Sequence, residues 1–268
     1  MGGSPGGFVT YLANKYAGAI FSLEHRWYGE SIPGDITSTG DLSTLSVEQA
    51  LADAAAFAAF VTDTWLQRQQ LVWVSVGGSY PGALSAWFRE KYPSVVDLAI
   101  SSSGVVAATK KFVEFDMQVK EAIGSVCAAQ VLAVTSAFEV AWQDSSLQAQ
   151  LFALFNTTPS RLTKADFAWM LADSAAMGDQ YGYKAAMCGM LAPAGAAPMD
   201  ALAAFAKWTS VHYGDLANQC YYSTSCLSDA AQKQQWYNQK TWVWQCCSQL
   251  AYWQVHYSSC HRALQCLG

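Results

Sequence analysis

The sequence predicts an α/β fold in which part of a parallel sheet is followed by a long block of helices. Two patterns lead to this prediction. Up to about residue 104, apolar runs typical of buried strands alternate with amphipathic helices, and beyond it helical periodicity continues with almost no strand signal. We therefore expect residues 1–104 to form the sheet unit, residues 105–255 an inserted helical cap and residues 256–268 a cysteine-containing tail.

Local signals place the elements of the expected sheet unit in order. Ser46 and Gln49 form a capping-box pattern, which marks the start of a helix whose apolar residues recur at helical spacing. Tyr92-Pro93 ends a second helix, because the residue before a proline disfavours the helical backbone. A polar loop is expected over residues 37–43. The expected strands cover residues 17–23, 71–76 and 95–100, and the first helix covers residues 46–69.

The composition excludes several classes of protein and partner. Hydrophobic residues make up 52% of the 268 residues and charged residues only 13%, which is atypical of a disordered chain. The net charge of −5 argues against a nucleic-acid partner, because binding phosphate requires clustered lysine and arginine. The run closest to a membrane span, Ala50–Val61, is interrupted by Asp53 and is shorter than the roughly 20 residues needed, so no membrane span is expected.

The cysteines indicate an oxidising environment. Eight are present, seven of them after residue 180, without a CxxC pair or the spacing of a zinc site. An even number in a chain with few charges favours disulfides, although the pairing does not follow from the sequence. Asn156-Thr157-Thr158 matches the acceptor pattern for N-glycosylation. The first residues lack the basic and apolar regions of a signal peptide, and one resolution is that the true N-terminus lies before this chain.

The turn after the strand expected at residues 71–76 contains the candidate catalytic residue. The chain continues as Gly77-Gly78-Ser79 and then enters a helix, which is the strand–turn–helix context of a nucleophile elbow. In that context the serine hydroxyl is held above the sheet at the start of the helix. Gly77 and Gly78 are expected to supply the backbone freedom that so sharp a turn demands. The alternative is a glycine-rich connection with an incidental serine.

The residues after Ser79 fit the same interpretation with one departure. The backbone N–H of Tyr80 is expected to point toward an oxyanion formed beside Ser79, where the helix N-terminus adds positive potential. The usual motif has glycine two residues after the serine, whereas here Pro81 occupies that place and Gly82 follows. Proline is acceptable in a first helical turn, because its missing N–H is not needed there.

Two long segments resemble the signatures of one family. Residues 24–33 read EHRWYGESIP and residues 77–88 read GGSYPGALSAWF, and looser landmarks follow at residues 112–116 and 244–249. In this order, over about residues 7–254, they resemble the serine carboxypeptidases that include lysosomal Pro-Xaa carboxypeptidase, dipeptidyl peptidase II and thymus-specific serine protease. The thymus-specific-like branch resembles the chain most.

The resemblance implies an α/β-hydrolase core with a helical insertion over the active site. It implies an exopeptidase that prefers proline next to the cleaved bond of its peptide substrates. In that role Ser79 attacks the peptide carbonyl to form an acyl-enzyme, and the Tyr80 N–H is one oxyanion donor. The family's members work in lysosomes, vacuoles or outside the cell, often as homodimers. We expect no cofactor.

The family's catalytic Asp and His follow the helical insertion, but no strand pattern after Gln254 carries them. Since the family's first strands precede the segment at Glu24, we expect the chain to be an internal portion, truncated at both ends. Without a positioned base, Ser79 is an ordinary alcohol, so little or no hydrolysis is expected from this chain alone.

The alternative is a non-catalytic hydrolase-like fragment that acts as a binding or dimerisation module. A lipase or esterase would share the turn but would not explain residues 24–33.

The four histidines are weak candidates for a replacement base or a metal site. We interpret His25 as a hydrogen-bonded structural residue and His212 as a surface or cap residue. His256 and His261 have a spacing that is common by chance, and no further ligands accompany them, so no metal is expected.

Two further groups have alternative interpretations. Glu24, His25 and Arg26 either contact substrate or form an internal ion pair that holds a strand end. The aromatic residues at 236–237 and 242–244 either line a substrate pocket or, as we favour, pack in the protein interior.

Overall fold

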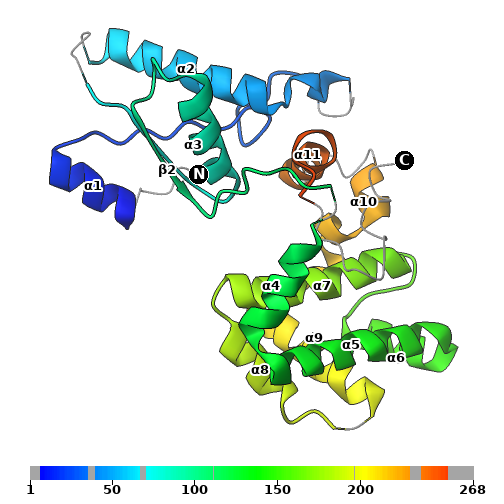
Figure 1. The fold of residues 1–268 in the computed structure, drawn as a ribbon. Coiled ribbons are helices and arrows are strands. Elements are labelled where there is room, and N and C mark those ends of the chain that lie inside the picture. The colour runs from blue at the N-terminus through cyan, green and yellow to red at the C-terminus, as the bar shows by residue number, and fades with distance from the viewer. Residues whose placement is uncertain are drawn as a thin grey trace. The chain divides into compact units, whose positions relative to one another are not determined.

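A computed structural model describes residues 7–35, 40–66, 71–110, 112–195, 197–229 and 237–252 of the chain. The chain forms two compact units. Unit 1 comprises Met1–Ala108 and Thr241–Ala251, and unit 2 comprises Thr109–Lys240 and Tyr252–Gly268. The segment Thr241–Ala251 therefore groups with unit 1 and not with the helical residues that precede it in sequence. Figure 1 colours the elements of both units along the chain.

Unit 1 is built around a two-stranded parallel sheet. Its elements are α1 (Phe8–Tyr16), the 3-10 turn η1 (Asp41–Thr44), α2 (Val47–Thr64), β1 (Val74–Gly78), α3 (Tyr80–Lys91), β2 (Leu98–Ser102), the part of α11 (Tyr237–Gln245) from Thr241 onward, and the π-helical turn η5 (Cys246–Leu250). The strands pair in register from Val74 opposite Leu98 to Gly78 opposite Ser102. Helix α3 connects the two strands and contacts both, as the crossover of a parallel pair requires.

The strand predictions are confirmed at two places and wrong at a third. The strands expected at 71–76 and 95–100 occur as β1 and β2, slightly later in the chain. The segment 17–23, also expected as a strand, has no regular secondary structure. Its apolar residue Phe21 is covered by aromatic rings, with centroid distances of 6.0 Å to Trp65 and 5.7 Å to Trp73. An apolar run predicts burial, but here only Ile20 and Phe21 are half-buried and the rest of the segment is exposed, so it forms neither a strand nor a buried face.

Helix α2 begins where the capping-box pattern predicts. The Ser46 hydroxyl accepts a hydrogen bond from the Gln49 N–H (3.2 Å), and the Gln249 side-chain oxygen accepts one from the Val47 N–H (3.2 Å). Two first-turn donors are thereby satisfied. The helix ends at Thr64, earlier than expected, and η1 occupies the end of the expected polar loop. Residues 37–39 of the expected loop and 67–69 of the expected helix lie outside the described residues.

All regular secondary structure in the described residues of unit 2 is helical, and the unit contains a large apolar core. Its elements are α4 (Val113–Ile123), α5 (Ser125–Gln143), α6 (Ser145–Leu154), α7 (Lys164–Gln180), α8 (Lys184–Leu191), α9 (Pro198–Tyr213), the 3-10 turns η2 (Leu216–Asn218) and η3 (Cys220–Tyr222), and α10 (Thr224–Ser228). The helical periodicity predicted for this part of the chain is confirmed. Phe138 of α5, Phe167 of α7 and Trp208 of α9 are buried, so these helices meet through large apolar side chains.

Helix α5 is long and apolar enough by composition to cross a membrane, which the sequence interpretation did not anticipate. In this fold it packs against α6 and α9 and buries Val134, Phe138 and Ala141. The Cys127–Cys188 disulfide ties it to α8. Helix α5 therefore contributes one face to the core of unit 2, while 28% of its apolar window is buried in this fold.

The disulfides predicted from the cysteine count are present. Besides Cys127–Cys188, a second disulfide links Cys220 of η3 to Cys226 of α10. Cys247 is also disulfide-bonded. Its neighbour Cys246 is a buried free thiol, and burial raises the pKa of that thiol to about 12.

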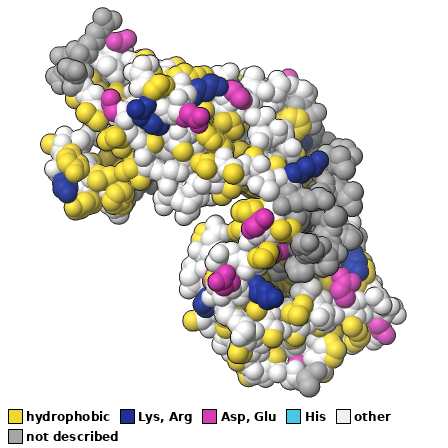
Figure 2. Space-filling model, in the orientation of Figure 1, with side chains coloured by type: hydrophobic (Ala, Val, Ile, Leu, Met, Phe, Trp, Pro, Cys, Tyr) yellow, Lys and Arg dark blue, Asp and Glu magenta, His cyan; other side chains and the backbone are white. Residues whose placement is uncertain are grey.

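Unit 1 leaves hydrophobic side chains exposed. Phe8, Tyr11 and Tyr16 of α1 are each more than half exposed, and hydrophobic side chains gather around α1 in the space-filling view (Figure 2). On the sheet, the register partners Val74 and Leu98 are 41% and 58% exposed. One face of the strand pair therefore presents apolar side chains to solvent.

Candidate active site

Ser79 occupies a sharp turn at the carboxyl end of β1. It directly follows Gly78, the last residue of β1, and precedes Tyr80, the first residue of α3. Its φ of 59° and ψ of −128° are strained for a residue with a side chain. The Ser79 N–H donates to the Ser102 carbonyl oxygen at the end of β2 (2.9 Å), and Ser79 itself is exposed. The strand, turn and helix expected from the sequence are present, with the serine at the surface.

The glycines of this turn allow close approach of the backbone. A Cβ at Gly77 would lie 2.0 Å from the Pro81 carbonyl oxygen, and one at Gly82 would lie 2.7 Å from a backbone oxygen of β2. At Gly78 the nearest atom would be 3.9 Å away, and neither Gly77 nor Gly78 has a positive φ. The expectation that these two glycines supply unusual backbone angles is wrong. Ser79 adopts the strained conformation, and Gly77 lets β1 and α3 touch.

The start of α3 brings backbone donors close to Ser79. Pro81 lies in the first helical turn, where its missing N–H removes no helical hydrogen bond. The Ala83 N–H donates to the Ser79 carbonyl oxygen (3.1 Å) and begins the helical ladder. The Tyr80 N–H precedes that ladder, at the positive end of the helix dipole. A negative charge that develops beside Ser79 would therefore be stabilised by α3.

The Tyr80 side chain is buried, and its hydroxyl lies between two polar partners. His25 Nε2 and Gln245 Nε2 are each 3.0 Å from the Tyr80 oxygen. Gln245 is itself buried, and its side-chain oxygen accepts a hydrogen bond from the Tyr28 hydroxyl. The Trp242 ring packs with its centroid 5.7 Å from that of Tyr80. Residues distant in sequence thus hold the side chain of the residue next to Ser79.

Glu24 is bonded to the loop that follows it. Its carboxylate accepts hydrogen bonds from the backbone N–H groups of Glu30 (3.1 Å) and Ser31 (3.0 Å) and from the Ser31 hydroxyl (2.7 Å). The Ser31 hydroxyl is the largest cause of a lowered Glu24 pKa, because it stabilises the charged form. Glu24 therefore stabilises the turn that contains Tyr28.

Arg26 forms a two-pronged ion pair with Asp53 of α2, in which Nη2 lies 2.6 Å from Oδ1. The Arg26 guanidinium is the main cause of a lowered Asp53 pKa, and the Gln49 side chain, 3.2 Å from Oδ1, acts in the same direction. The pair attaches the segment around residue 26 to α2.

His25 is half-buried between these two anchors. Its Nδ1 lies 2.7 Å from the Arg26 carbonyl oxygen, and its ring packs with its centroid 5.2 Å from that of Tyr28. Burial is the largest influence on the His25 pKa and lowers it, against the opposing effects of the Arg26 carbonyl and the Asp53 carboxylate. The imidazole is therefore neutral at pH 7.

The other histidines are not brought to Ser79 by any described contact. His212 Nδ1 lies 3.0 Å from the Trp208 carbonyl oxygen within α9, and His256 and His261 fall outside the described residues. Across the described ranges, no hydrogen bond joins the Ser79 hydroxyl to a histidine or a carboxylate. The same part of the chain holds no group of three or more His, Cys, Asp or Glu arranged to bind a metal ion.

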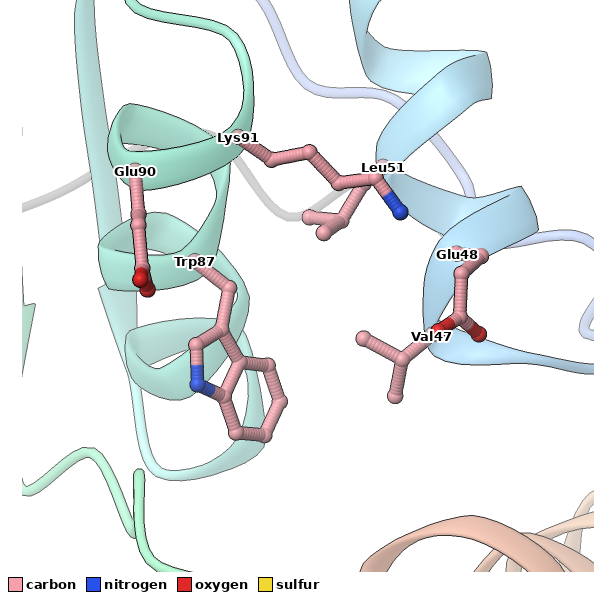
Figure 3. Close-up of a pocket in the computed structure, with 6 residues that line it drawn as sticks. All are labelled: Val47, Glu48, Leu51, Trp87, Glu90 and Lys91. Atoms are coloured by element: carbon pink, nitrogen blue, oxygen red, sulfur yellow. The ribbon is translucent and has the colours of Figure 1, made fainter.

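A surface hollow of about 500 Å³ lies between α2 and α3. Figure 3 shows the side chains of Trp87 and Val47 facing each other across it. Ser79 is not among its lining residues, so this hollow is distinct from the serine turn. The lining residues are Val47, Glu48, Leu51, Trp87, Glu90 and Lys91.

Three residues that support the turn were not singled out from the sequence. Asp53 was noticed only as a charge inside an apolar run, and Tyr28 and Gln245 only as members of longer segments. Gln245 lies 165 positions from Tyr80, and no local spacing rule predicts such a contact. The available signal for Asp53 was a charged residue inside an otherwise apolar helical run, because carboxylates that are partly removed from water are normally paired. Of the aromatic residues considered for a pocket, Trp242 packs against Tyr80, and residues 230–236 fall outside the described residues.

Comparison with known proteins relates the chain to serine peptidases. The family described as Serine carboxypeptidase S28 matches residues 3–266. The chain is 30% identical over 263 residues to Probable serine protease EDA2 of Arabidopsis thaliana, an alignment that covers 92% of this chain and 52% of that protein. It is 32% identical over 138 residues to Thymus-specific serine protease of Homo sapiens (52% of this chain, 27% of that protein). It is 37% identical over 117 residues to Lysosomal Pro-X carboxypeptidase of Bos taurus (42% and 23%). The chain thus spans about half the length of the Arabidopsis relative.

Proposed function

We propose a serine exopeptidase function for this chain, which belongs to the serine carboxypeptidase S28 family. In this proposal the Ser79 hydroxyl attacks the peptide carbonyl carbon and forms an acyl-enzyme, which water then hydrolyses. The observation that carries the proposal is the exposed Ser79, with a φ of 59°, between the end of β1 and the start of α3. A strained serine at the surface of such a turn is the geometry of a nucleophile elbow.

The start of α3 supplies the electrostatic part of the proposed mechanism. When the carbonyl carbon becomes tetrahedral, its oxygen gains negative charge, which backbone donors stabilise. The Tyr80 N–H is the proposed donor, since it stands at the positive end of α3 directly after Ser79. Gly77 and Gly82 support this role indirectly, because the absence of their side chains allows β1, β2 and α3 to meet.

The substrate class is proposed from the relatives. One relative is named Lysosomal Pro-X carboxypeptidase, so we propose peptide substrates with proline next to the cleaved bond. A lysosomal, vacuolar or extracellular location agrees with the disulfides, which persist in oxidising compartments. The exposed Asn156, within its Asn-Thr-Thr triplet, is a proposed glycan acceptor in the same compartments. Within this proposal unit 2 is the helical cap of an α/β-hydrolase core, and the enzyme works as a dimer.

Serine nucleophiles need a base, and this requirement sets the expected rate. In the part of the chain that the structure describes, no hydrogen bond joins the Ser79 hydroxyl to an imidazole or a carboxylate. Removal of triad members lowers kcat by roughly 10⁴- to 10⁶-fold. We therefore propose that the chain alone turns over Pro-containing peptides very slowly or not at all.

A fluorophosphonate probe tests the nucleophile in a form of the protein that also contains the family's catalytic Asp and His, because phosphonylation, like peptide cleavage, needs a base that activates the serine. The expected result is a phosphonate adduct on the peptide that contains Ser79, detected by mass spectrometry, lost in Ser79→Ala and retained in Ser94→Ala. Ser94 is a matched control because it is also an exposed serine of unit 1. An adduct that persists in Ser79→Ala would reject Ser79. Absence of any adduct at Ser79 after prolonged incubation would reject it as well, in favour of a non-catalytic module.

A further inference from the structure

An ordered series of hydrogen bonds connects the segment around His25 to the residue beside Ser79. It begins at the Arg26 carbonyl oxygen, 2.7 Å from His25 Nδ1. A carbonyl oxygen only accepts, so Nδ1 carries a proton. A neutral imidazole then has an unprotonated Nε2, which accepts from the Tyr80 hydroxyl at 3.0 Å.

The remaining members of the series are oriented by the same reasoning. Because the Tyr80 proton points to His25, the Tyr80 oxygen is the acceptor for Gln245 Nε2 at 3.0 Å. The Gln245 oxygen in turn accepts from the Tyr28 hydroxyl. The Arg26 carbonyl oxygen therefore fixes the direction of the first hydrogen bond, and the neutral state of His25 then fixes the direction of the other three.

The series is placed where hydrogen bonds are strong. The Tyr80 side chain is 8% exposed and Gln245 is fully buried. Hydrogen bonds away from water are strengthened by the low local dielectric, and a broken one is correspondingly costly. His25, Tyr28, Tyr80 and Gln245 all belong to unit 1, although they come from three separate parts of the sequence.

The hydrogen bonds that hold the Tyr80 side chain also restrain the backbone of Ser79, because the two residues are adjacent in sequence. A strained φ persists only where the surroundings hold it in place. On one side, the Ser79 N–H is bonded to β2 at the Ser102 carbonyl oxygen. On the other, the Tyr80 side chain is anchored by His25 and Gln245. We propose that His25, as its neutral Nδ1–H tautomer, is a positioning residue that holds the Ser79–Tyr80 turn through the Tyr80 hydroxyl. The catalytic meaning of this role rests on the proposed function.

The proposal makes the turn sensitive to acid. Protonation converts His25 Nε2 into a donor, so the Tyr80 hydroxyl can no longer donate to it and the series must rearrange. The charged groups that act on His25 are Asp53, which favours protonation, and Arg26, which opposes it, while the rings of Tyr28 and Tyr80 face it. Burial outweighs these effects and lowers the His25 pKa, so the series stays intact into mildly acidic solution.

NMR titration of the full chain decides the proposal without an activity assay. In the wild type, His25 is expected to be protonated at Nδ1 and not at Nε2 at pH 7. The amide signals of Ser79 and Tyr80 and the side-chain amide of Gln245 should shift together as His25 titrates, with a midpoint below 6.5. In Tyr80→Phe, which keeps the ring, the Ser79 signal should no longer follow His25. An Nε2–H tautomer, or turn signals that ignore the titration of His25, would overturn the proposal.

A matched pair of variants separates positioning from general loss of structure. His25→Gln keeps a side-chain acceptor for the Tyr80 hydroxyl, whereas His25→Leu removes it. His25→Gln is expected to keep the turn signals and lose their pH dependence, and His25→Leu to lose the wild-type turn signals while unit 2 signals stay unchanged. If the Ser79 and Tyr80 amide signals were the same in His25→Gln and His25→Leu, the result would count against the proposal.

Fluorophosphonate labelling of the form that also contains the family's catalytic Asp and His then connects the turn to the proposed function. The rate constant at Ser79 should be similar in wild type and His25→Gln and roughly 10- to 100-fold lower in His25→Leu. If no variant is labelled at Ser79, the proposed function fails, while the NMR titration still decides the role of His25. Labelling of His25→Leu at the wild-type rate would overturn the positioning role.

Discussion

The Ser79 N–H and the Ser102 carbonyl oxygen, 2.9 Å apart, tie the exposed serine to the end of the neighbouring strand. This hydrogen bond completes the last register pair of the parallel strands, Gly78 opposite Ser102. The conformation of Ser79 is therefore supported by the sheet as well as by α3. A turn fixed from both sides keeps an exposed hydroxyl in one position.

Alanine at Gly77 should destabilise unit 1, because its Cβ would lie 2.0 Å from the Pro81 carbonyl oxygen. The expected loss is roughly 2–4 kcal/mol in urea unfolding. Gly78→Ala is the matched control, since its Cβ would come no closer than 3.9 Å to another atom. Equal losses in the two variants would show that close approach is not what selects glycine at position 77.

The strain at Ser79 should appear as a difference between two variants that both lack the hydroxyl. Glycine tolerates a φ of 59° and alanine does not, so Ser79→Gly should be more stable than Ser79→Ala. The expected difference is about 1 kcal/mol in chemical unfolding. A more stable Ser79→Ala would mean that the backbone at this position relaxes when the hydroxyl is removed.

The Arg26–Asp53 pair should contribute stability that disappears in acid. The Asp53 pKa is lowered from its ordinary value of 3.8, chiefly by Arg26. A lowered carboxyl pKa gives a contribution that is complete above that ordinary value and is lost as the pH falls through the folded-state pKa. Because both side chains are partly exposed, we expect about 1 kcal/mol.

Urea unfolding of wild type and Asp53→Asn, between pH 6 and pH 2.5, measures that contribution. The two stability curves should converge at the acidic end. Curves that stay parallel down to pH 2.5 would assign the stabilisation to something other than the charge of Asp53.

The two disulfides with both cysteines described should differ in the stability they provide. Cys127–Cys188 closes 61 residues of chain and Cys220–Cys226 closes 6. Loop-closure entropy predicts about 4 kcal/mol for the first and about 2 kcal/mol for the second. Thermal unfolding of the paired serine variants compares them, and a larger loss for the Cys220–Cys226 variant would contradict the loop-length argument.

The exposed strand face should make unit 1 prone to association. Val74 and Leu98 lie opposite each other with exposed side chains, and apolar surface on a short sheet favours aggregation. Replacing both with threonine keeps strand propensity and should lower light scattering and the binding of a hydrophobic dye. The pair Leu132→Thr and Val140→Thr, also exposed but on α5, is the control that should change less.

Local features of the fold could be predicted from the sequence, and long-range ones could not. The cap at Ser46, the order strand–turn–helix around Ser79 and the helices of unit 2 all follow from patterns within a few residues. The segment 17–23 carries the same apolar signal as a strand, but in the structure it has no regular secondary structure and most of its residues are exposed. Which glycine of the turn is required depends on distances to backbone atoms that no motif contains.

The support of Tyr80 shows the same limit at the candidate site. Tyr80 could be assigned a backbone role because it follows Ser79 directly in a recognisable turn. Its side-chain partners, His25 and Gln245, lie 55 and 165 positions away, and their contact depends on how the chain returns to unit 1. The His25 tautomer follows from a contact between Nδ1 and a backbone carbonyl oxygen, which cannot be read from a single sequence.

Cys246 and Cys247 place a reduced sulfur beside an oxidised one. Attack on a disulfide requires the thiolate, and burial keeps the Cys246 thiol protonated up to a pKa of about 12. The native protein is thereby shielded from exchange between these neighbours, whereas local opening of η5 would release an attacking group one residue from its target. Disulfide exchange during refolding at mildly alkaline pH should therefore begin with Cys246 attacking the disulfide of Cys247. The substitution Cys246→Ala should slow this exchange.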